Sequence, residues 1–110
     1  MTRLGKAMKA KPETFAGLAG LGDLATTCFS PNSRNRSVGS ELGKGQSLKD
    51  ILASMDAVAE GVVTAKSVHD LTRKLHIEMP ITRAVYEILY CAKSPRKAMA
   101  DLMRRSLKKE

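Results

Sequence analysis

The apolar residues of this chain recur at helical spacing, and this period constrains its fold more than any other feature. They stand three or four positions apart in residues 48–55, 62–75 and 81–91. Such spacing places them along one face of an α-helix, whereas a half-buried strand would alternate apolar and polar residues. No segment of the sequence shows that alternation. The pattern therefore predicts one all-α domain of six to seven helices over residues 1–110.

Turn and cap residues set the expected helix ends. Asn32 or Ser33 can cap one helix, Ser47 with Asp50 resembles a capping box, and Pro95 suits a first helical position. The expected helical segments are residues 1–10, 11–15, 24–28, 33–42, 48–55, 62–75, 81–91 and 96–107. A helix restarts at residues 11–15, with Pro12 at its first position, and the helix at 24–28 is short.

The composition indicates how the core is built and where the chain resides. Aromatic residues make up 4% and Trp is absent, so the core must consist of Leu, Ile, Val, Met and Ala. Cys28 and Cys91 form no disulfide framework and are expected to be small buried hydrophobes, which fits a reducing cytoplasm. No apolar run reaches transmembrane length and no signal peptide is visible, so no membrane partner is expected.

The net charge of +8 leaves several partners open. Nucleic acid, a membrane surface or a phosphorylated small molecule would suit a basic chain, and so would no partner at all, because basic residues also form ordinary solvated faces. Basic residues are densest in 3–11, 33–36 and 104–109. None of these runs is long enough to be a nucleic-acid-binding arm by itself, so the charge does not predict nucleic acid as the ligand.

A glycine cluster interrupts the helical pattern at Gly17, Gly20 and Gly22. Residues 20–25 match the dinucleotide fingerprint GxGxxA, but no strand precedes them and Asp23 would oppose a pyrophosphate, so we reject that assignment. The glycines instead suit a close backbone approach. Asp23 has two interpretations: it is an ordinary helix N-cap, or it is a site residue that accepts hydrogen bonds from a substrate.

A polar and basic cluster follows at Ser33, Arg34, Asn35 and Arg36. At a helix start, free backbone N–H groups, a hydroxyl, an amide and a guanidinium together form a good phosphate site. An exposed basic turn explains the same residues equally well. Further along, Glu60 precedes Gly61 and a strong helix, where an acidic residue needs no function.

The two histidines do not predict a metal site. His69 lies in the middle of a helix and is expected at the surface, and His76 follows a helix end. Neither has metal-ligand spacing to another His, Cys or acidic residue, so no metal is expected.

Five motifs in order resemble one known family. They are Pro12-Glu13-Thr14-Phe15, the GLAGLGDL stretch of residues 17–24, Ser33-Arg34-Asn35-Arg36, Glu60-Gly61-Val62, and Glu78-Met79-Pro80-Ile81. Together they resemble the C-terminal domain of the bacterial NAD(P)-dependent glycerol-3-phosphate dehydrogenases, over nearly the whole chain. GLAGLGDL with SRNR at this distance is highly specific.

The resemblance implies a fold and a reaction. The fold would be that of the 6-phosphogluconate dehydrogenase C-terminal-like domains, preceded by a Rossmann domain that binds most of the NAD or NADP. The reaction would be the reduction of dihydroxyacetone phosphate to glycerol 3-phosphate for phospholipid synthesis. A homodimer is compatible with this assignment.

The resemblance also assigns roles to residues. Asp23 would contact the reacting end of the substrate and assist a catalytic lysine. Ser33, Arg34 and Asn35 would bind the substrate, the last two at its phosphate. Arg34, Val58 and Glu60 would border the cofactor.

The family's catalytic lysine and its Rossmann domain have no counterpart in this sequence. Lys6, Lys9 and Lys11 stand too close to the GLAGLGDL stretch to match that lysine. We therefore expect the chain to be inactive alone and to expose an apolar face. The alternative function is a small basic helical module that binds nucleic acid or a protein.

Overall fold

The computed structural model describes residues 1–106, and within them every regular element is a helix. Eight are α-helices and one short stretch, η1, is a π-helix. Their bounds are α1 Thr2–Ala7, α2 Glu13–Ala16, η1 Leu18–Gly22, α3 Asp23–Phe29, α4 Arg34–Gly43, α5 Leu48–Ala53, α6 Glu60–Lys74, α7 Pro80–Tyr90 and α8 Pro95–Met103. The all-α prediction is confirmed. The number of helices exceeds the predicted six to seven because the short helices around the glycines are separate elements.

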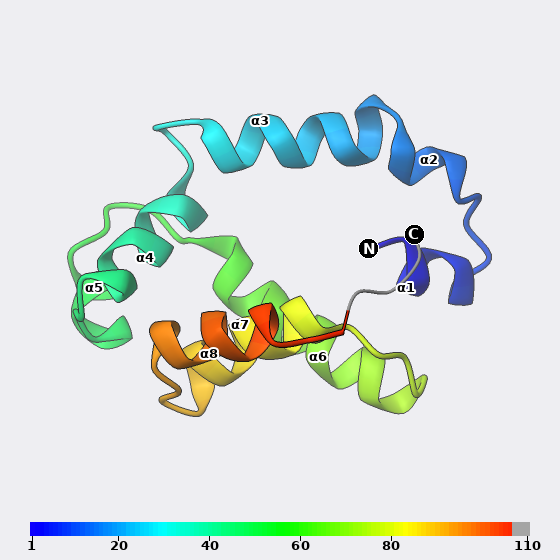
Figure 1. The fold of residues 1–110 in the computed structure, drawn as a ribbon. Coiled ribbons are helices and arrows are strands. Elements are labelled where there is room, and N and C mark those ends of the chain that lie inside the picture. Colours follow the sequence, from blue (N-terminus) through cyan, green and yellow to red (C-terminus); the bar gives the residue numbers. More distant parts are fainter. Residues whose placement is uncertain (107–110) are drawn as a thin grey trace.

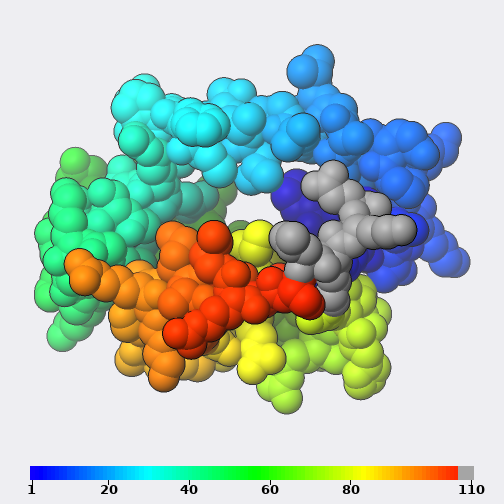
Figure 2. Space-filling model, in the orientation of Figure 1, coloured from blue at the N-terminus to red at the C-terminus, as the bar shows by residue number. Residues whose placement is uncertain are grey.

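The helices form a body and an arm (Figure 1). In the body, α6 packs against α7 and α7 against α8, while α4 and α5 pair at the end where α6 begins. The arm consists of α2, η1 and α3, whose main contacts are with one another and, at the far end, with α4. In Figure 2 the arm spans an opening and joins the rest of the molecule at its two ends.

The core is small and is made of short side chains. Val38, Ile51, Ala59 and Val62 form its centre, where α4, α5 and the start of α6 meet. Three buried alanines, Ala65, Ala84 and Ala98, allow α6, α7 and α8 to approach closely. The expectation of an aliphatic core is confirmed, and valine and alanine provide most of it.

The arm makes the molecule open for its size. The chain exposes 8615 Å², against roughly 6,000 Å² for a compact monomer of this mass. Its radius of gyration is 14.8 Å, against about 13 Å for a compact domain near this length. Large apolar side chains account for part of the excess: Leu18 is 89% exposed and Phe29 is 82% exposed.

Glycine fixes the bend within the arm, between α2 and η1. The N–H of Gly22 donates to the carbonyl of Gly17 at 3.3 Å, a bond of π-helical spacing. A Cβ on Gly20 would collide with the backbone of Phe15, so this position accepts only glycine. The expected close backbone approach is therefore present, between η1 and the end of α2.

Several expectations about burial are wrong. Cys28 and Cys91 are exposed, because α3 lies on the arm and Cys91 caps the end of α7. Val85, which belongs to the apolar pattern of residues 81–91, is 40% exposed rather than buried. His69 was expected at the surface but is half-buried, because its ring stacks on Tyr86 of the adjacent helix.

The helix ends also differ in two places. The first helix ends at Ala7 rather than residue 10, because Lys9 adopts a left-handed φ of 65°. The last helix ends at Met103. Its expected end at Leu107, and the part of the basic tail beyond Ser106, lie outside the described residues. Within residues 1–106, no helix is both long and apolar enough to cross a membrane.

Candidate functional site

The start of α4 is formed by the cap that the sequence predicts. Ser33 has an extended backbone, and its Oγ accepts a hydrogen bond from the N–H of Arg36 at 3.3 Å. The N–H groups of the first turn point out of the helix end, where the helix dipole favours an anion. Arg34, Asn35 and Arg36 are exposed beside that turn.

Two hydrogen bonds join this turn to the residues that begin α6. The Nη1 of Arg34 donates to the carbonyl of Val58 at 3.3 Å. The N–H of Gly61 donates to Oδ1 of Asn35 at 3.1 Å. The starts of α4 and α6 are thereby fixed beside each other, although 24 or more residues separate them in the sequence. We call this junction, Ser33–Arg36 with Val58–Val62, the α4–α6 junction.

Gly61 is a site residue whose role the sequence pattern does not reveal. A Cβ at this position would collide with the side-chain amide of Asn35. The glycine is therefore needed for Asn35 to reach the backbone of α6. The only signal in the sequence is a glycine in the first turn of a strong helix, where glycine has no other benefit.

The structure brings together most of the sequence-predicted site residues. Ser33, Arg34, Asn35, Val58 and Glu60 all belong to the α4–α6 junction. The last four of these are exposed, so they are available to a ligand or to another domain. Glu60 lies in the first turn of α6, where an acid also stabilises the helix.

Asp23 lies apart from this junction, on the arm. It is the first residue of α3, and Gly22, not Asp23, occupies the cap position. The N-cap interpretation of Asp23 is therefore wrong, since no side-chain capping bond forms. Across residues 1–106, its exposed carboxylate has no hydrogen bond and no ion pair. The side chain is thus free to receive a ligand group.

A cavity of about 370 Å³ borders the α4–α6 junction. Asn35 and Gly61 form its polar edge, and the rest is formed by apolar residues of α4 and α7 together with Val62 and Pro95. The cavity is smaller than a second one, of about 1040 Å³, between the end of α6, α7 and α8.

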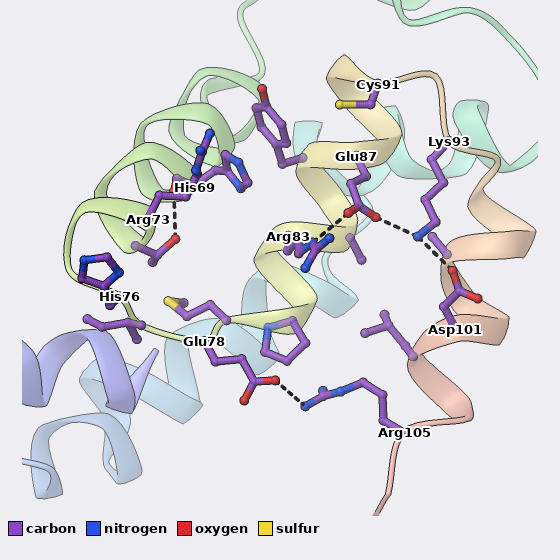
Figure 3. Close-up of a pocket in the computed structure, with 18 residues that line it drawn as sticks. His69, Arg73, His76, Glu78, Arg83, Glu87, Cys91, Lys93, Asp101 and Arg105 are labelled. Carbon is purple, nitrogen blue, oxygen red and sulfur yellow. Dashed lines mark hydrogen bonds and ion pairs between the residues drawn. The ribbon is translucent and has the colours of Figure 1, made fainter.

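The larger cavity is crossed by an ion-pair network (Figure 3). Oε1 of Glu87 accepts from Arg83 at 2.8 Å, and Oε2 accepts from Lys93 at 2.7 Å. Lys93 also pairs with Asp101 at 2.9 Å. Hydrogen bonds from Lys93 and Arg83 lower the pKa of Glu87, the Lys93 bond lowers that of Asp101, and the Glu87 bond raises the pKa of Lys93.

This network joins α7 to α8, and its charges satisfy one another. None of the residues predicted for the site lines this cavity. In the part of the chain that the structure describes, no three His, Cys, Asp or Glu side chains gather in a way that could hold a metal ion.

Residues 1–100 match the family described as "NAD-dependent glycerol-3-phosphate dehydrogenase C-terminus". Curated proteins with the name of this enzyme are similar to the chain over its whole length. A glycerol-3-phosphate dehydrogenase [NAD(P)+] of Solidesulfovibrio magneticus is 59% identical over all 110 residues, and one of Geobacter sulfurreducens is 56% identical. The chain spans 33% of the length of each of these relatives.

A solved structure shares the fold. The crystal structure of glycerol-3-phosphate dehydrogenase from Coxiella burnetii superposes with a TM-score of 0.90 at 41% sequence identity. The match covers 94% of this chain and 32% of that one.

Proposed function

Because the chain belongs to the family of NAD-dependent glycerol-3-phosphate dehydrogenases, as the C-terminal part of such an enzyme, we propose that it is the substrate-binding domain. The whole enzyme would transfer a hydride between a nicotinamide cofactor and dihydroxyacetone phosphate, giving glycerol 3-phosphate for phospholipid synthesis. This chain would supply the site for the substrate and not the main site for the cofactor.

The α4–α6 junction is the observation that carries this proposal. A phosphate there would meet the N–H groups of the first turn of α4 together with the hydroxyl of Ser33, the guanidinium of Arg34 and the amide of Asn35. Among residues 1–106, the side chain of Arg34 is held by one bond of 3.3 Å, to the neutral carbonyl of Val58. A phosphate dianion is a much stronger partner for its fork of N–H donors.

Asp23 is proposed as a catalytic residue at the other end of the substrate. Its exposed carboxylate, which has no partner within residues 1–106, can accept a hydrogen bond from a substrate hydroxyl. It can also favour the protonated form of a nearby lysine, which would donate a proton to the substrate oxygen during reduction. The resemblance places that lysine in the N-terminal part of the enzyme, so Asp23 completes a site that this chain does not form alone.

The junction also fits a cofactor that another domain binds. Val58 is 68% exposed, and Glu60 and Arg34 are exposed beside it. An exposed valine flanked by polar side chains suits the edge of a nicotinamide nucleotide, which would supply or accept the hydride when bound. These three residues would then orient the nicotinamide against the substrate and exclude water from it.

The proposed partner of this chain is an N-terminal Rossmann domain. The curated relatives are about three times as long as this chain, and the chain exposes far more surface than a compact monomer. Apolar side chains on the arm, Leu18, Leu21 and Phe29, contribute to that surface. Covering them would bury apolar area and would fix the arm that carries Asp23. Without that domain we expect no dehydrogenase activity. A homodimer of the whole enzyme is compatible with this proposal.

A titration of the isotope-labelled 110-residue chain with glycerol 3-phosphate tests the substrate role. We expect the amide resonances of Asp23 and of Ser33–Asn35 to shift, and glycerol at equal concentration to leave them in place. Inorganic phosphate should move only the Ser33–Asn35 group. A chain whose resonances move with a short DNA duplex, but not with glycerol 3-phosphate, would instead support the basic binding module.

A chimeric enzyme allows activity to be measured. In it, this chain replaces the matching C-terminal third of a curated relative, and dihydroxyacetone phosphate reduction is followed by the oxidation of NADH or NADPH. An inactive but folded chimera would contradict the proposed function.

A further inference from the structure

Tyr90, on α7, contacts the α4–α6 junction. It is the last residue of α7, and its hydroxyl donates a hydrogen bond to the carbonyl of Val62 at 2.8 Å in a part-buried position. Val62 lies in the first turn of α6, directly after the residue that binds Asn35. The sequence pattern assigns Tyr90 no role.

Three side chains thus hold one short segment of backbone. Arg34 binds the carbonyl of Val58, Asn35 binds the N–H of Gly61, and Tyr90 binds the carbonyl of Val62. The first two come from α4 and the third from α7. The bond from Tyr90 is the shortest of the three, and Tyr90 is the only one of these three side chains that is not itself proposed to bind a ligand.

An aromatic stack fixes the direction of the Tyr90 hydroxyl. The ring of Tyr90 lies 5.2 Å from that of Tyr86, one turn earlier on α7. Tyr86 in turn stacks on His69 of α6, with ring centroids 3.8 Å apart and planes within 2°. Because Val62 and His69 lie two turns apart on α6, the two tyrosines align α7 along the same face of that helix.

We propose that Tyr90 is a positioning residue: it fixes the first turn of α6 so that Gly61 meets Asn35, and thereby holds the phosphate-binding start of α4 in place. The functional part of this inference rests on the proposed function. The positioning of Gly61 does not rest on it and can be measured separately.

Tyr90→Phe tests the inference, because it removes the hydroxyl and keeps the ring in the stack. Tyr86→Phe is the matched control, since the hydroxyl of Tyr86 has no hydrogen bond within residues 1–106. In the 110-residue chain, we expect the Gly61 amide to exchange its hydrogen about three- to tenfold faster in Tyr90→Phe than in Tyr86→Phe. The Ala65 amide, one turn further along α6, should change by less than twofold. Equal acceleration of both amides, or of neither, would overturn the positioning role.

The chimeric enzyme gives the second measurement. Tyr90→Phe should raise KM for dihydroxyacetone phosphate about three- to tenfold with kcat within twofold, and Tyr86→Phe should change neither. If Arg34→Ala raises KM while Tyr90→Phe leaves it unchanged, Tyr90 does not position the substrate site. If Arg34→Ala also leaves KM unchanged, the proposed function fails together with the functional part of this inference, and the exchange of Gly61 still decides the positioning.

Discussion

The Oδ1 of Asn35 accepts a hydrogen bond from the N–H of Gly61 at 3.1 Å, and no side chain could be placed on Gly61 without displacing it. Gly61→Ala should therefore force Asn35 out of position. Overpacking of this kind costs typically about 1–3 kcal/mol of unfolding free energy. Thermal unfolding of the chain measures that loss, and a raised KM of the chimera would report the displaced Asn35.

Gly39→Ala is the control for this change. Gly39 lies within α4, and a Cβ there has open space around it. Alanine should stabilise the helix by up to about 1 kcal/mol. If the two alanine variants had equal stability, the tight contact between Asn35 and Gly61 would be refuted.

Arg34→Ala should weaken substrate binding. Hydrogen bonds to a charged group contribute about 1.5–3 kcal/mol, so KM for dihydroxyacetone phosphate should rise roughly 10- to 150-fold. Arg34→Lys should restore little, because a single ammonium replaces a bidentate fork. Arg36→Ala is the control: this neighbour has no side-chain hydrogen bond or ion pair in the described part of the chain, and its loss should change KM by less than threefold. An unchanged KM in both Arg34 variants would exclude a phosphate role.

Gly20→Ala should disturb the arm more than Gly17→Ala. A Cβ on Gly20 would collide with the backbone of Phe15, whereas one on Gly17 would meet only the carbonyl of Glu13 at an ordinary 3.8 Å. We expect a stability loss of about 1–3 kcal/mol for the first and a much smaller change for the second. Because η1 leads directly into Asp23, kcat of the chimera should fall with Gly20→Ala. Equal effects of the two substitutions would contradict the close approach.

Lys93→Met should make stability less dependent on acid pH. The pKa values of Glu87 and Asp101 are lowered in the folded chain by their bonds to Lys93, so the stability they contribute is present at neutral pH. It is lost as the pH falls through their folded-state pKa values, below the ordinary carboxyl range. The raised pKa of Lys93 has the opposite sign, and its contribution is lost only as the pH rises through the lysine range.

The melting temperature of the variant should therefore be lower than that of the original chain at pH 7, and the two should converge on acidification. Lys66→Met is the control, since Lys66 is exposed on α6 and has no ion pair within residues 1–106. If the melting temperatures of Lys93→Met and the original chain differed by the same amount at pH 7 and at acid pH, the ion-pair network would not be the cause of the pH dependence.

The exposed arm should make the isolated chain self-associate. Phe29→Ser removes one of its most exposed apolar side chains and should reduce association in sedimentation at high protein concentration. Lys49→Ser, at an exposed position of α5, is the control. The same Phe29 substitution in the chimera should instead weaken the contact with the N-terminal domain, seen as an earlier unfolding transition. A purely monomeric chain at high concentration would argue against an apolar docking face.

The positions of the helices could be predicted from the sequence, because capping residues and the helical spacing of apolar residues are features of neighbouring residues. Ser33 and Ser47 cap the helices that their neighbours predict, and Pro80 and Pro95 begin theirs. Burial followed less well, since it depends on which helices meet. Nothing in the local sequence shows that α3 stands away from the body and exposes Cys28, or that Tyr86 covers His69.

The resemblance names candidate site residues but not their geometry. The motif resemblance named Arg34, Asn35, Val58 and Glu60, which the fold does bring together. Gly61 and Tyr90 were missed because their roles depend on contacts across 26 and 28 residues. Such contacts leave no periodic trace in a single sequence.

The bond from Arg34 to the carbonyl of Val58 has a consequence for how two ligands interact. It couples a side chain proposed to bind phosphate to a segment proposed to border the nicotinamide nucleotide. A phosphate that drew the guanidinium away from that carbonyl would change the conformational freedom of the Val58 segment. Binding equilibria are reciprocal. If bound substrate changes the affinity for the nucleotide by some factor, bound nucleotide changes the affinity for the substrate by the same factor. One arginine would thus couple the affinities of the two ligands by the same factor, whichever of them binds first.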